Sequence, residues 1–381
     1  MKNRINVLCA TDRNFLYPAY VTIASVIHNH KRFDVRFFLI VDEDISKEDL
    51  DRLEKYVSST GNSIEFLSLT DKSFDEFETC ERFTKAAYFR LMAHKYLPQD
   101  ADRVLYLDVD IVVDKDISEF YFMDFQDKYL IATSHNPCPD YYNMLNSTIV
   151  NLQAAGRGEF FNSGVIVFNL DKFREAGITE KDYVDAYNYC RENEIEVFYD
   201  QGLLNFMFYD KTLYLSSMDY NFRYSIPRDY ASRLDPDREY KKAIIHYTGM
   251  KQPYKPWDIV FTDEEIEMFG DVPYKSDFFY VSKECNDLMK IWWEYARLTP
   301  VYEELLHDEK VKHKWFARNL MPIFLKYNVL LGKTPNKEIQ RIFRDKVIVQ
   351  YPEDFHHRAY KLGCALFAPY FWLRKRLQKK K

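Results

Sequence analysis

Glycine is scarce in this sequence, and its scarcity excludes two common ways of binding nucleotides. Only 10 of the 381 residues are glycine. The first expected strand-to-helix turn, CATDRNF at 9–15, contains none, so the dinucleotide-binding fingerprint is missing. The single Gly-Lys-Thr, at 332–334, has Tyr327 where a phosphate-cradling loop needs its first glycine. Any bound phosphate must therefore be neutralised mainly by other groups, and a divalent cation held by carboxylates is the usual substitute.

Paired cysteines and long apolar segments are missing as well. The six cysteines are scattered and form no Cys-x-x-Cys, which argues against a zinc site or a disulfide framework and favours a reducing cytosol. The chain starts directly with an expected strand, so we expect no secretory signal segment. The longest apolar run near the C-terminus, at 362–373, is interrupted by Pro369 and is too short to span a bilayer. We therefore expect no transmembrane helix.

Composition and charge limit the remaining classes of protein. Hydrophobic residues make up 47% of the chain and aromatic residues 17%, which suffices for a packed interior and lies outside the disordered regime. The net charge of -6 argues against a nucleic-acid-binding protein. A chain of 381 residues is long for one core, so we expect a catalytic domain over 1–260 and a helical extension over 261–381.

The first two thirds of the sequence alternate between short apolar strands and amphipathic helices. This alternation predicts βαβ units, and hence an α/β fold with a mainly parallel central sheet. From residue 263 onward the pattern is typical of helices only. The expected strands lie at 5–10, 35–42, 63–69, 103–110, 130–134, 164–170, 212–217 and 243–249, and the expected helices at 17–30, 46–58, 84–96, 182–193 and 200–208.

Four aspartates gather directly after an apolar strand, in VLYLDVDIVVDKD. They are Asp108, Asp110, Asp114 and Asp116. Alternate residues of a strand face the same side, so Asp108 and Asp110 face together while Val109 points away. Two like charges at that separation are costly unless a cation lies between them, and open α/β sheets bind ligands at the C-termini of strands. The alternative is that these are loop-entry aspartates bonded to backbone amides.

Six motifs follow one another in order along the chain. They read CATDRNF at 9–15, KAAYFRL at 85–91, VLYLDVD at 104–110, FNSGVIVFNL at 161–170, YDQGLLN at 199–205 and IIHYTG at 244–249, followed by KPW at 255–257. In these motifs the chain resembles the family-eight retaining glycosyltransferases, the glycogenin-like and lipopolysaccharide galactosyltransferase-like group. The resemblance covers about the first 257 residues and implies a nucleotide-diphospho-sugar transferase fold of the GT-A type.

The resemblance implies a DxD metal site. It assigns Asp108, Asp110 and His246 to a divalent metal, usually Mn²⁺, with Mg²⁺ as the alternative. Two carboxylates and one imidazole leave room for phosphate oxygens and a water around an octahedral ion, and this mixed donor set suits manganese better than calcium. Without the Tyr-Thr-Gly and Lys-Pro-Trp that follow it, His246 would instead be interpreted as a strand-end histidine.

The resemblance also implies contacts to a UDP-sugar donor. Asp12 and Asn14 match positions around the uracil and ribose, and Ala10 and Thr11 allow close backbone approach. Phe15 stands where many relatives have a tyrosine, but stacking on the base needs a π face rather than a hydroxyl. By itself Asn14 would be an ordinary turn or helix-entry residue. Further donor-binding positions implied by the resemblance are Arg90, Val109, Asn162, Ser163, Gly164, Gly249 and Lys255.

Asp200 and Gln201 are the catalytic candidates. The resemblance places Asp200 against sugar hydroxyls and Gln201 near the anomeric carbon, although Asp200 would also suit a helix N-cap. Two departures from the family pattern affect the donor. Five residues instead of two separate the expected glycine from Lys255, which leaves Lys251 as the alternative pyrophosphate contact. His135 stands where galactose-transferring relatives often have an acidic sugar contact, so the donor sugar stays open.

The reaction that the resemblance implies is transfer of a hexose, glucose or galactose, from a UDP-sugar to a saccharide acceptor of a cell-envelope glycoconjugate with retention of configuration. A sugar-phosphate nucleotidyltransferase is a rival, but it needs a glycine- and lysine-rich N-terminal loop that CATDRNF does not supply. A non-catalytic nucleotide-sugar or glycan-binding module is a second rival. The intact acidic and histidine positions speak against it.

The C-terminal tail, ALFAPYFWLRKRLQKKK at 365–381, combines aromatic and aliphatic residues with six basic residues and no acidic one. Such a sequence can lay an apolar edge into a membrane interface while its cations meet anionic headgroups. The alternative is that the apolar part packs on preceding helices and the lysines form a solvated end. We expect a cytoplasmic enzyme, docked peripherally on the inner face of the cell membrane and acting on a glycan acceptor that is lipid-linked.

Overall fold

The computed structural model describes residues 4–68, 90–134, 160–195, 199–223, 238–248, 255–258, 260–262 and 283–319. The chain divides into two compact units. The first comprises Met1–Thr248 and Ile291–Tyr302, and the second comprises Gly249–Lys290 and Glu303–Lys381. The domain boundary at residue 260 stays a prediction, and the tail at 365–381 lies outside the described residues.

The first unit is built on a central sheet with the strand order β3-β2-β1-β4-β7-β6-β8. Every neighbouring pair is parallel except the two that involve β7, so the expected α/β fold with a mainly parallel sheet is confirmed. The strands are β1 Arg4–Thr11, β2 Asp34–Val41, β3 Ser63–Ser68, β4 Arg103–Leu107, β6 Leu130–Ser134, β7 Phe161–Asn169 and β8 Thr212–Ser216. A second, three-stranded sheet has the order β5-β10-β9. Its strands are β5 Ile111–Val113, β10 Ile244–His246 and β9 Phe222–Arg223.

The helices of the described residues include those expected at 17–30, 46–58, 182–193 and 200–208, together with three short helices that were not predicted, at 118–121, 170–175 and 217–220. They are α1 Leu16–Asn29, α2 Lys47–Ser59, α4 Ala93–Tyr96, α5 Ser118–Tyr121, α8 Leu170–Glu175, α9 Glu180–Glu192, α10 Tyr199–Phe208, α11 Ser217–Tyr220, α14 Lys283–Ala296 and α15 Tyr302–Asn319. The Ser46 hydroxyl caps α2 by accepting a hydrogen bond from the Asp49 N–H, as serine at a helix start commonly does. Of the helix expected over 84–96, the described part is a 3-10 turn at Arg90–Met92 followed by α4. Within the described ranges, no helix combines the length and apolarity that crossing a membrane would require.

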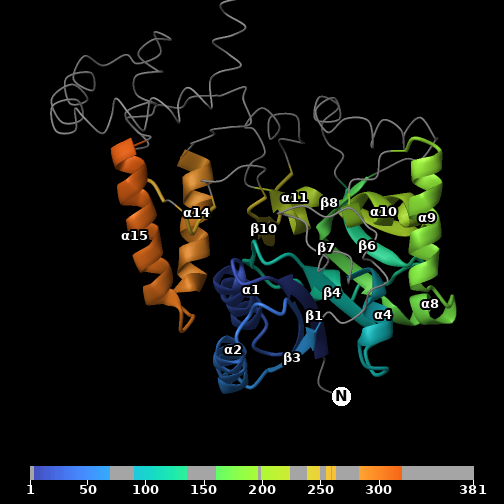
Figure 1. The fold of residues 1–381 in the computed structure, drawn as a ribbon, viewed down its shortest axis with the longest axis horizontal. Coiled ribbons are helices and arrows are strands. Elements are labelled where there is room, and N and C mark those ends of the chain that lie inside the picture. The colour runs from blue at the N-terminus through green and yellow to red at the C-terminus, as the bar shows by residue number, and fades with distance from the viewer. Residues whose placement is uncertain are drawn as a thin grey trace, which may run out of the picture. The chain divides into compact units, whose positions relative to one another are not determined.

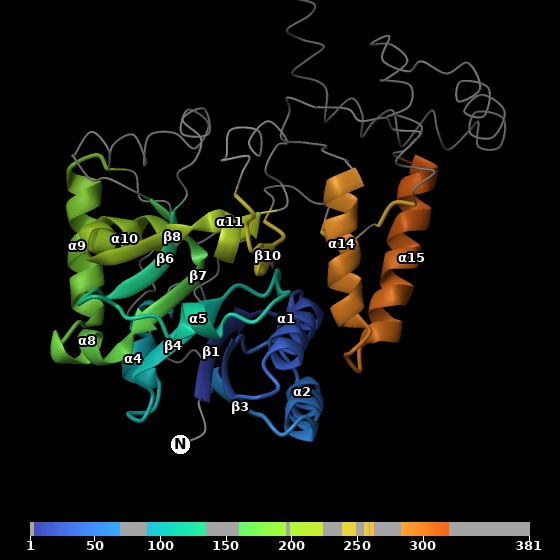
Figure 2. The same ribbon diagram turned by 180° about the vertical axis from the view of Figure 1, so that it is seen from behind.

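The core of the first unit lies on the sheet. The central strands are nearly continuous apolar runs because they are covered on both faces, as is usual for parallel strands. On one face, Tyr106 and Phe168 from the strands pack against Phe173 of α8, Tyr183 of α9 and Phe208 of α10. Figures 1 and 2 show α2 beside β3 and α9 beside α10 at opposite ends of this sheet. Burial of these strands places their ends, and the loops that follow, in defined positions.

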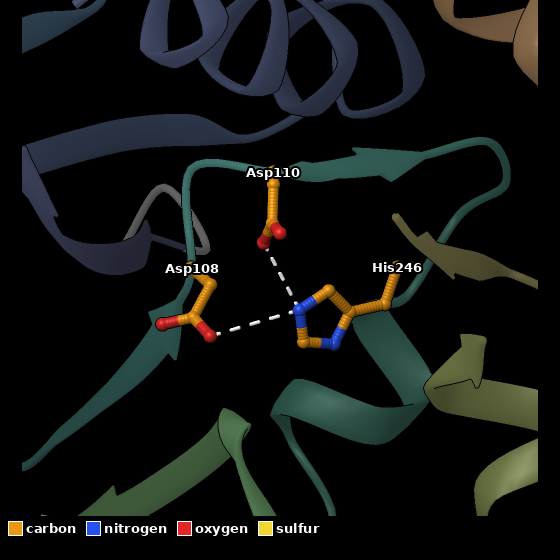
Figure 3. Close-up of side chains that lie close together, drawn as sticks. All are labelled: Asp108, Asp110 and His246. Atoms are coloured by element: carbon orange, nitrogen blue, oxygen red, sulfur yellow. Dashed lines mark hydrogen bonds and ion pairs between the residues drawn. The ribbon is translucent and has the colours of Figure 1, made fainter. Parts of the chain in front are cut away.

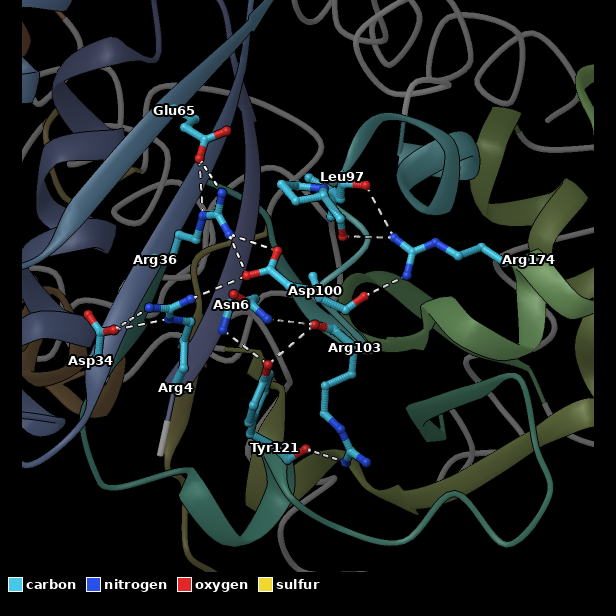
Figure 4. A network of polar contacts seen from close by, with 12 residues as sticks. Arg4, Asn6, Asp34, Arg36, Glu65, Leu97, Asp100, Arg103, Tyr121 and Arg174 are labelled. Atoms are coloured by element: carbon cyan, nitrogen blue, oxygen red, sulfur yellow. Dashed lines mark hydrogen bonds and ion pairs between the residues drawn. The ribbon is translucent and has the colours of Figure 1, made fainter. Parts of the chain in front are cut away.

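The edge where β1 and β2 begin carries a polar network that is structural (Figure 4). Arg4 pairs with Asp34 at 2.9 Å, and Arg36 pairs with Glu65 at 2.5 Å and with Asp100 at 3.2 Å. Most of these side chains are partly exposed, so each pair contributes little to stability. The residues expected to bind the donor and the metal after β1 and β4 lie at the opposite edge, where these parallel strands end.

Candidate metal and donor-sugar site

The Asp-Val-Asp segment crosses from the large sheet to the small one. Asp108 directly follows β4, and its N–H donates to the Gly164 carbonyl of β7 at 2.9 Å. The Thr22 hydroxyl of α1 lies 3.0 Å from the Val109 carbonyl and 2.7 Å from the Ile111 carbonyl. The segment is therefore held from both sides, and its two carboxylates project from a fixed backbone.

His246 reaches this segment through strand pairing. In the antiparallel pairing of β5 with β10, Ile111 lies opposite His246, and the Tyr247 N–H donates to the Asp110 carbonyl at 2.9 Å. The imidazole Nε2 lies 3.0 Å from Asp110 Oδ1 and 3.6 Å from Asp108 Oδ2 (Figure 3). One ligand atom from each of the three residues lies within 4.8 Å of the others.

The surroundings of this cluster fit a divalent cation. The imidazole Nδ1 of His246 is occupied by Asn221 Oδ1 at 2.9 Å, so Nε2 is the nitrogen that faces the carboxylates. A Cβ on Gly164 would lie 2.4 Å from the His246 ring and 2.5 Å from Asp108 Oδ2, so the cluster needs a glycine here. Two carboxylates and one imidazole form a donor set that first-row divalent ions accept.

A buried cation links this cluster to the catalytic candidates. Arg90 lies 3.3 Å from Asp108 Oδ1 through Nη1 and 3.3 Å from Asp200 Oδ2 through Nε, and its guanidinium lies 4.0 Å from the Tyr106 ring centroid. Burial disfavours the cation, but the carboxylates of Asp200 and Asp108 and the polar Tyr106 together raise the pKa of Arg90. The Tyr106 hydroxyl also donates to Asp108 Oδ1 at 2.9 Å. Arg90 is thus a buried permanent charge and not a solvated helix residue.

Asp200 and Gln201 lie in the first turn of α10. Asp200 is 1% exposed, and burial raises its pKa while Arg90 opposes that rise and Asp108 adds to it. Apart from the ion pair with Arg90, its Oδ2 has no hydrogen-bond partner among the described residues. Gln201 Oε1 accepts from Asn162 Nδ2 at 2.9 Å and from the Ser163 N–H at 3.1 Å. Asn162, Ser163 and Gly164, at the start of β7, therefore lie between the metal cluster and α10.

The turn after β1 is the predicted nucleotide contact. Ala10 and Thr11 end β1, which is the neighbour of β4 in the sheet. Asp12 Oδ1 accepts from the Phe15 N–H at 2.9 Å, which shapes the entry into α1. Asn14 is exposed and Phe15 is half-buried. These positions are compatible with either a nucleotide contact or an ordinary turn, so their role stays a prediction.

The remaining predicted residues are Gly249, Lys251, Lys255 and His135. Lys255 belongs to the second unit, where its ammonium lies 5.7 Å from the ring centroid of Trp257. Gly249, Lys251 and His135 lie outside the described residues. The pyrophosphate contact therefore stays a prediction, and the donor sugar stays open.

Three residues that matter to the geometry carry no sequence signal of their own. Thr22 lies in mid-helix, Tyr106 in mid-strand, and Asn221 in a short connection after α11, so each is an ordinary residue for its place. What distinguishes them is a contact across the fold: Thr22 with the Asp-Val-Asp backbone, Tyr106 with Arg90 and Asp108, and Asn221 with His246. Of the three, Tyr106 comes nearest to a signal, because a polar hydroxyl inside an apolar strand needs a partner.

The solved structures share this architecture. The galactosyltransferase LgtC, in complex with donor and acceptor sugar analogs, is 24% identical, with a TM-score of 0.53 over 66% of this chain and 89% of that one. The glycosyltransferase GlyE of Streptococcus pneumoniae TIGR4 is 21% identical, with a TM-score of 0.52 over 83% of this chain and 64% of that one. These likenesses confirm the expected GT-A type fold.

Two sequence relatives point the same way. A lipopolysaccharide 1,2-glucosyltransferase of Escherichia coli is 24% identical over 87% of this chain and 92% of its own length. A lipopolysaccharide 1,3-galactosyltransferase of Salmonella typhimurium is 23% identical over 67% of this chain and 74% of its own length. The family model for glycosyl transferase family 8 matches residues 6–260, which is more than half of the chain. The protein therefore belongs to glycosyl transferase family 8, as its six motifs indicate.

Proposed function

We propose that this protein transfers a hexose, glucose or galactose, from a UDP-sugar to a saccharide acceptor of a cell-envelope glycoconjugate, with retention of configuration. The observation that carries the proposal is the convergence of Asp108, Asp110 and His246 beside the buried Asp200 and Gln201. The relatives named as lipopolysaccharide glucosyl- and galactosyltransferases support the hexose and the envelope acceptor.

The metal that we propose is Mn²⁺, with Mg²⁺ as the alternative, held by Asp108, Asp110 and His246. When bound, it would supply Lewis-acid stabilisation of the charge that grows on the departing UDP. The protein's own part is to hold the two carboxylates and Nε2 of His246 close together before the donor arrives. Arg90 offsets part of the carboxylates' mutual repulsion because it pairs with Asp108.

Donor orientation would rest on Asp200. Its buried Oδ2 keeps an acceptor lone pair beside the ion pair with Arg90, and a sugar hydroxyl is a group that could donate to it. A buried acceptor that receives no hydrogen bond is costly even beside a cation, so a hydrogen bond from the donor sugar to Oδ2 would favour one orientation of the sugar. The same contact would leave the anomeric carbon near Gln201.

Retention favours attack on the same face as the departing phosphate. The carboxylate of Asp200 is committed to Arg90, and Gln201 Oε1 already accepts two hydrogen bonds, so neither is a free nucleophile. In the proposed step the bond from the anomeric carbon to the phosphate oxygen breaks and a bond to the acceptor oxygen forms. The acceptor's hydroxyl proton passes to the departing phosphate oxygen.

The two rival functions predict different reactions. A sugar-phosphate nucleotidyltransferase would release pyrophosphate, and a binding module would release nothing. Incubation with UDP-glucose and with UDP-galactose, with and without Mn²⁺, separates them when UDP release is measured. We expect metal-dependent UDP release from one of the two donors. Full turnover in EDTA, or no release with any acceptor saccharide, would contradict the proposal.

We assign the pyrophosphate contact to Lys255. Its support is the Pro-Trp that follows, as in the family motif. The comparison of Lys255→Ala with Lys251→Ala tests the assignment through kcat/KM for the donor. A larger loss in Lys251→Ala would move the contact to that residue.

The basic aromatic tail at 365–381 is the proposed membrane contact of a cytoplasmic enzyme. Each basic residue near an anionic surface contributes about 1 kcal/mol at low ionic strength, which makes the binding salt-sensitive. Co-sedimentation with anionic vesicles should be lost in a chain that ends after Cys364. Equal sedimentation of both chains would leave a soluble acceptor as the better hypothesis.

A further inference from the structure

Asn221 lies in the connection between α11 and β9 and belongs to none of the motifs that identify the family. It is 1% exposed, and both ends of its side-chain amide are engaged. Its Oδ1 lies 2.9 Å from Nδ1 of His246, and its Nδ2 lies 3.0 Å from Oδ1 of Asn162. Asn221 therefore connects the proposed metal ligand to the strand that faces the donor sugar.

Backbone N–H groups determine which way the neighbouring amides point. The Gly164 N–H donates to Asn162 Oδ1 at 3.1 Å, and the Ser163 N–H donates to Gln201 Oε1 at 3.1 Å. A backbone N–H can only donate, so both acceptors must be the oxygen ends of their amides. The remaining bond, from Asn162 Nδ2 to Gln201 Oε1 at 2.9 Å, then has donor and acceptor in the correct order.

The same argument reaches His246. Because Asn162 presents its oxygen, the end of Asn221 that faces it must be the amide nitrogen, and the oxygen of Asn221 therefore faces the imidazole. An oxygen acceptor requires a hydrogen on Nδ1 of His246. The lone pair that can bind a metal is then on Nε2, the nitrogen directed at Asp108 and Asp110.

We propose that Asn221 is a positioning residue that sets the tautomer and ring orientation of His246 for metal binding. Its own orientation is set through Asn162 by the backbone of β7. The inference rests on the metal site of the proposed function. It adds that the metal ligand and the sugar-facing residues Asn162 and Gln201 share one chain of directed hydrogen bonds.

Two substitutions at Asn221 distinguish its hydrogen bond to His246 from its hydrogen bond to Asn162. Asn221→Ala removes both bonds and should raise the Mn²⁺ dissociation constant about 10- to 100-fold, the usual effect of losing a partner that orients a metal-binding histidine. Asn221→Asp keeps an acceptor for the Nδ1 hydrogen but cannot donate to Asn162. We expect it to bind Mn²⁺ at least as tightly as the unaltered protein while kcat/KM for the donor falls about tenfold, as for one lost hydrogen bond.

The experiment titrates Mn²⁺ alone into the full chain and measures free Mn²⁺ by electron paramagnetic resonance, with UDP release measured separately. Asn6→Ala is the matched control, because Asn6 is a buried asparagine at the opposite edge of the sheet. It should keep the Mn²⁺ dissociation constant of the unaltered protein even if the thermal midpoint falls. A purely structural role for Asn221 would instead weaken Mn²⁺ binding to a similar degree in the Ala and Asp variants.

The outcomes that overturn the inference differ from those that overturn the proposed function. If the unaltered protein binds no Mn²⁺, the proposed metal-dependent transfer is wrong, and the inference is lost with it. If the unaltered protein and Asn221→Ala bind Mn²⁺ equally, only the inference is wrong. If both variants fail to fold, Asn221 serves folding and the assignment is likewise wrong.

Discussion

The two pairs of aspartates on either side of β5 have the same spacing, but their side chains have different partners. Asp108 and Asp110 precede the strand and converge with His246. Asp114 and Asp116 follow it, and their carboxylates bind Tyr295 and Arg32 of the same protein. Because β5 and β10 are antiparallel, the start of β5 lies beside His246, whereas Asp114 donates its N–H to Ala243 just before β10.

The partners of the second pair are structural. Asp114 Oδ1 accepts from the Tyr295 hydroxyl at 2.9 Å, and burial raises the pKa of Asp114 while that hydrogen bond opposes the rise. Asp116 pairs with Arg32 at 2.6 Å and accepts from the Ser118 N–H at 2.8 Å. Burial opposes the shift, but the Ser118 bonds and the nearby Arg32 cation lower the pKa of Asp116. Among the described residues, only the first pair forms a cluster with a third ligand, His246, so Asp-x-Asp spacing alone does not identify a metal site.

The largest expected effect distinguishes the two pairs directly. Asp110→Ala removes a proposed ligand and should lower UDP-sugar turnover by about 10²-fold or more, as expected when a leaving-group stabiliser is lost. Asp116→Asn, at the other end of β5, should leave turnover and the Mn²⁺ dissociation constant unchanged. Steady-state kinetics on both variants make the comparison. Similar losses of turnover in both would abolish the distinction between the pairs.

Gly164→Ala tests the space that the first pair requires. The added Cβ would lie 2.4 Å from the His246 ring and 2.5 Å from Asp108 Oδ2, and a contact that short forces both side chains to move. A displacement of about 1 Å at a reacting centre can lower turnover by about 10²-fold. We expect a loss of about tenfold or more in kcat/KM together with weaker Mn²⁺ binding. Unchanged Mn²⁺ affinity would mean that the cluster does not need its present geometry.

Tyr295→Phe tests the second pair through stability. The Tyr295 hydroxyl donates to Asp114 and accepts from Asn29 Nδ2 at 2.9 Å, so its removal leaves two partly buried groups less satisfied. The free energy of unfolding should fall by about 1–2 kcal/mol with turnover per folded molecule unchanged. Tyr189→Phe is the control, because Tyr189 is 53% exposed and should be neutral. A selective loss of turnover in Tyr295→Phe would give the second pair a functional role.

The smallest expected effect is a pH dependence beside Asp116. Burial lowers the pKa of His30, and its ring is bonded as the neutral form, with Nδ1 donating to the Val26 carbonyl and Nε2 accepting from the Ile117 N–H. Asp116 opposes the lowering and Arg32 adds to it. As the pH is lowered below the ordinary histidine pKa of about 6.5, His30 therefore takes up a proton in the unfolded chain before it does so in the folded one. The free energy of unfolding decreases as the pH is lowered through this range.

Chemical unfolding between pH 7.5 and 5.5 measures this dependence. The His30→Gln variant should have a flatter dependence than the unaltered protein, by at most about 1.4 kcal/mol per pH unit, the slope that one proton contributes. The difference between the two chains removes the contributions of the carboxyl groups that both share. Identical slopes would show that His30 is not held as the neutral form.

The sequence predicted those parts of the fold that depend on local patterns. The longer strands of the large sheet and the helices α1, α2, α9 and α10 lie close to their expected positions, because apolar runs and amphipathic periodicity are local properties. The short elements β5, α5 and α8 were not predicted. The helix over 84–96 was less predictable: Arg90 to Met92 form a 3-10 turn, and Arg90 is buried against Asp108, which follows β4, and Asp200 of α10. Periodicity cannot report a charge that is neutralised from elsewhere in the chain.

By itself, the sequence determined the family motifs and the α/β alternation, because each depends on residues close together in the chain. The family resemblance named the aspartates that meet His246, but only the tertiary structure gives the physical reason, because the meeting depends on the register of β5 against β10. It also places Asn221 between residues of β7 and β10, which the sequence pattern does not indicate. Hydrogen-bond partners separated by 25 and 59 positions leave no local pattern, so they become visible only when the strands are placed.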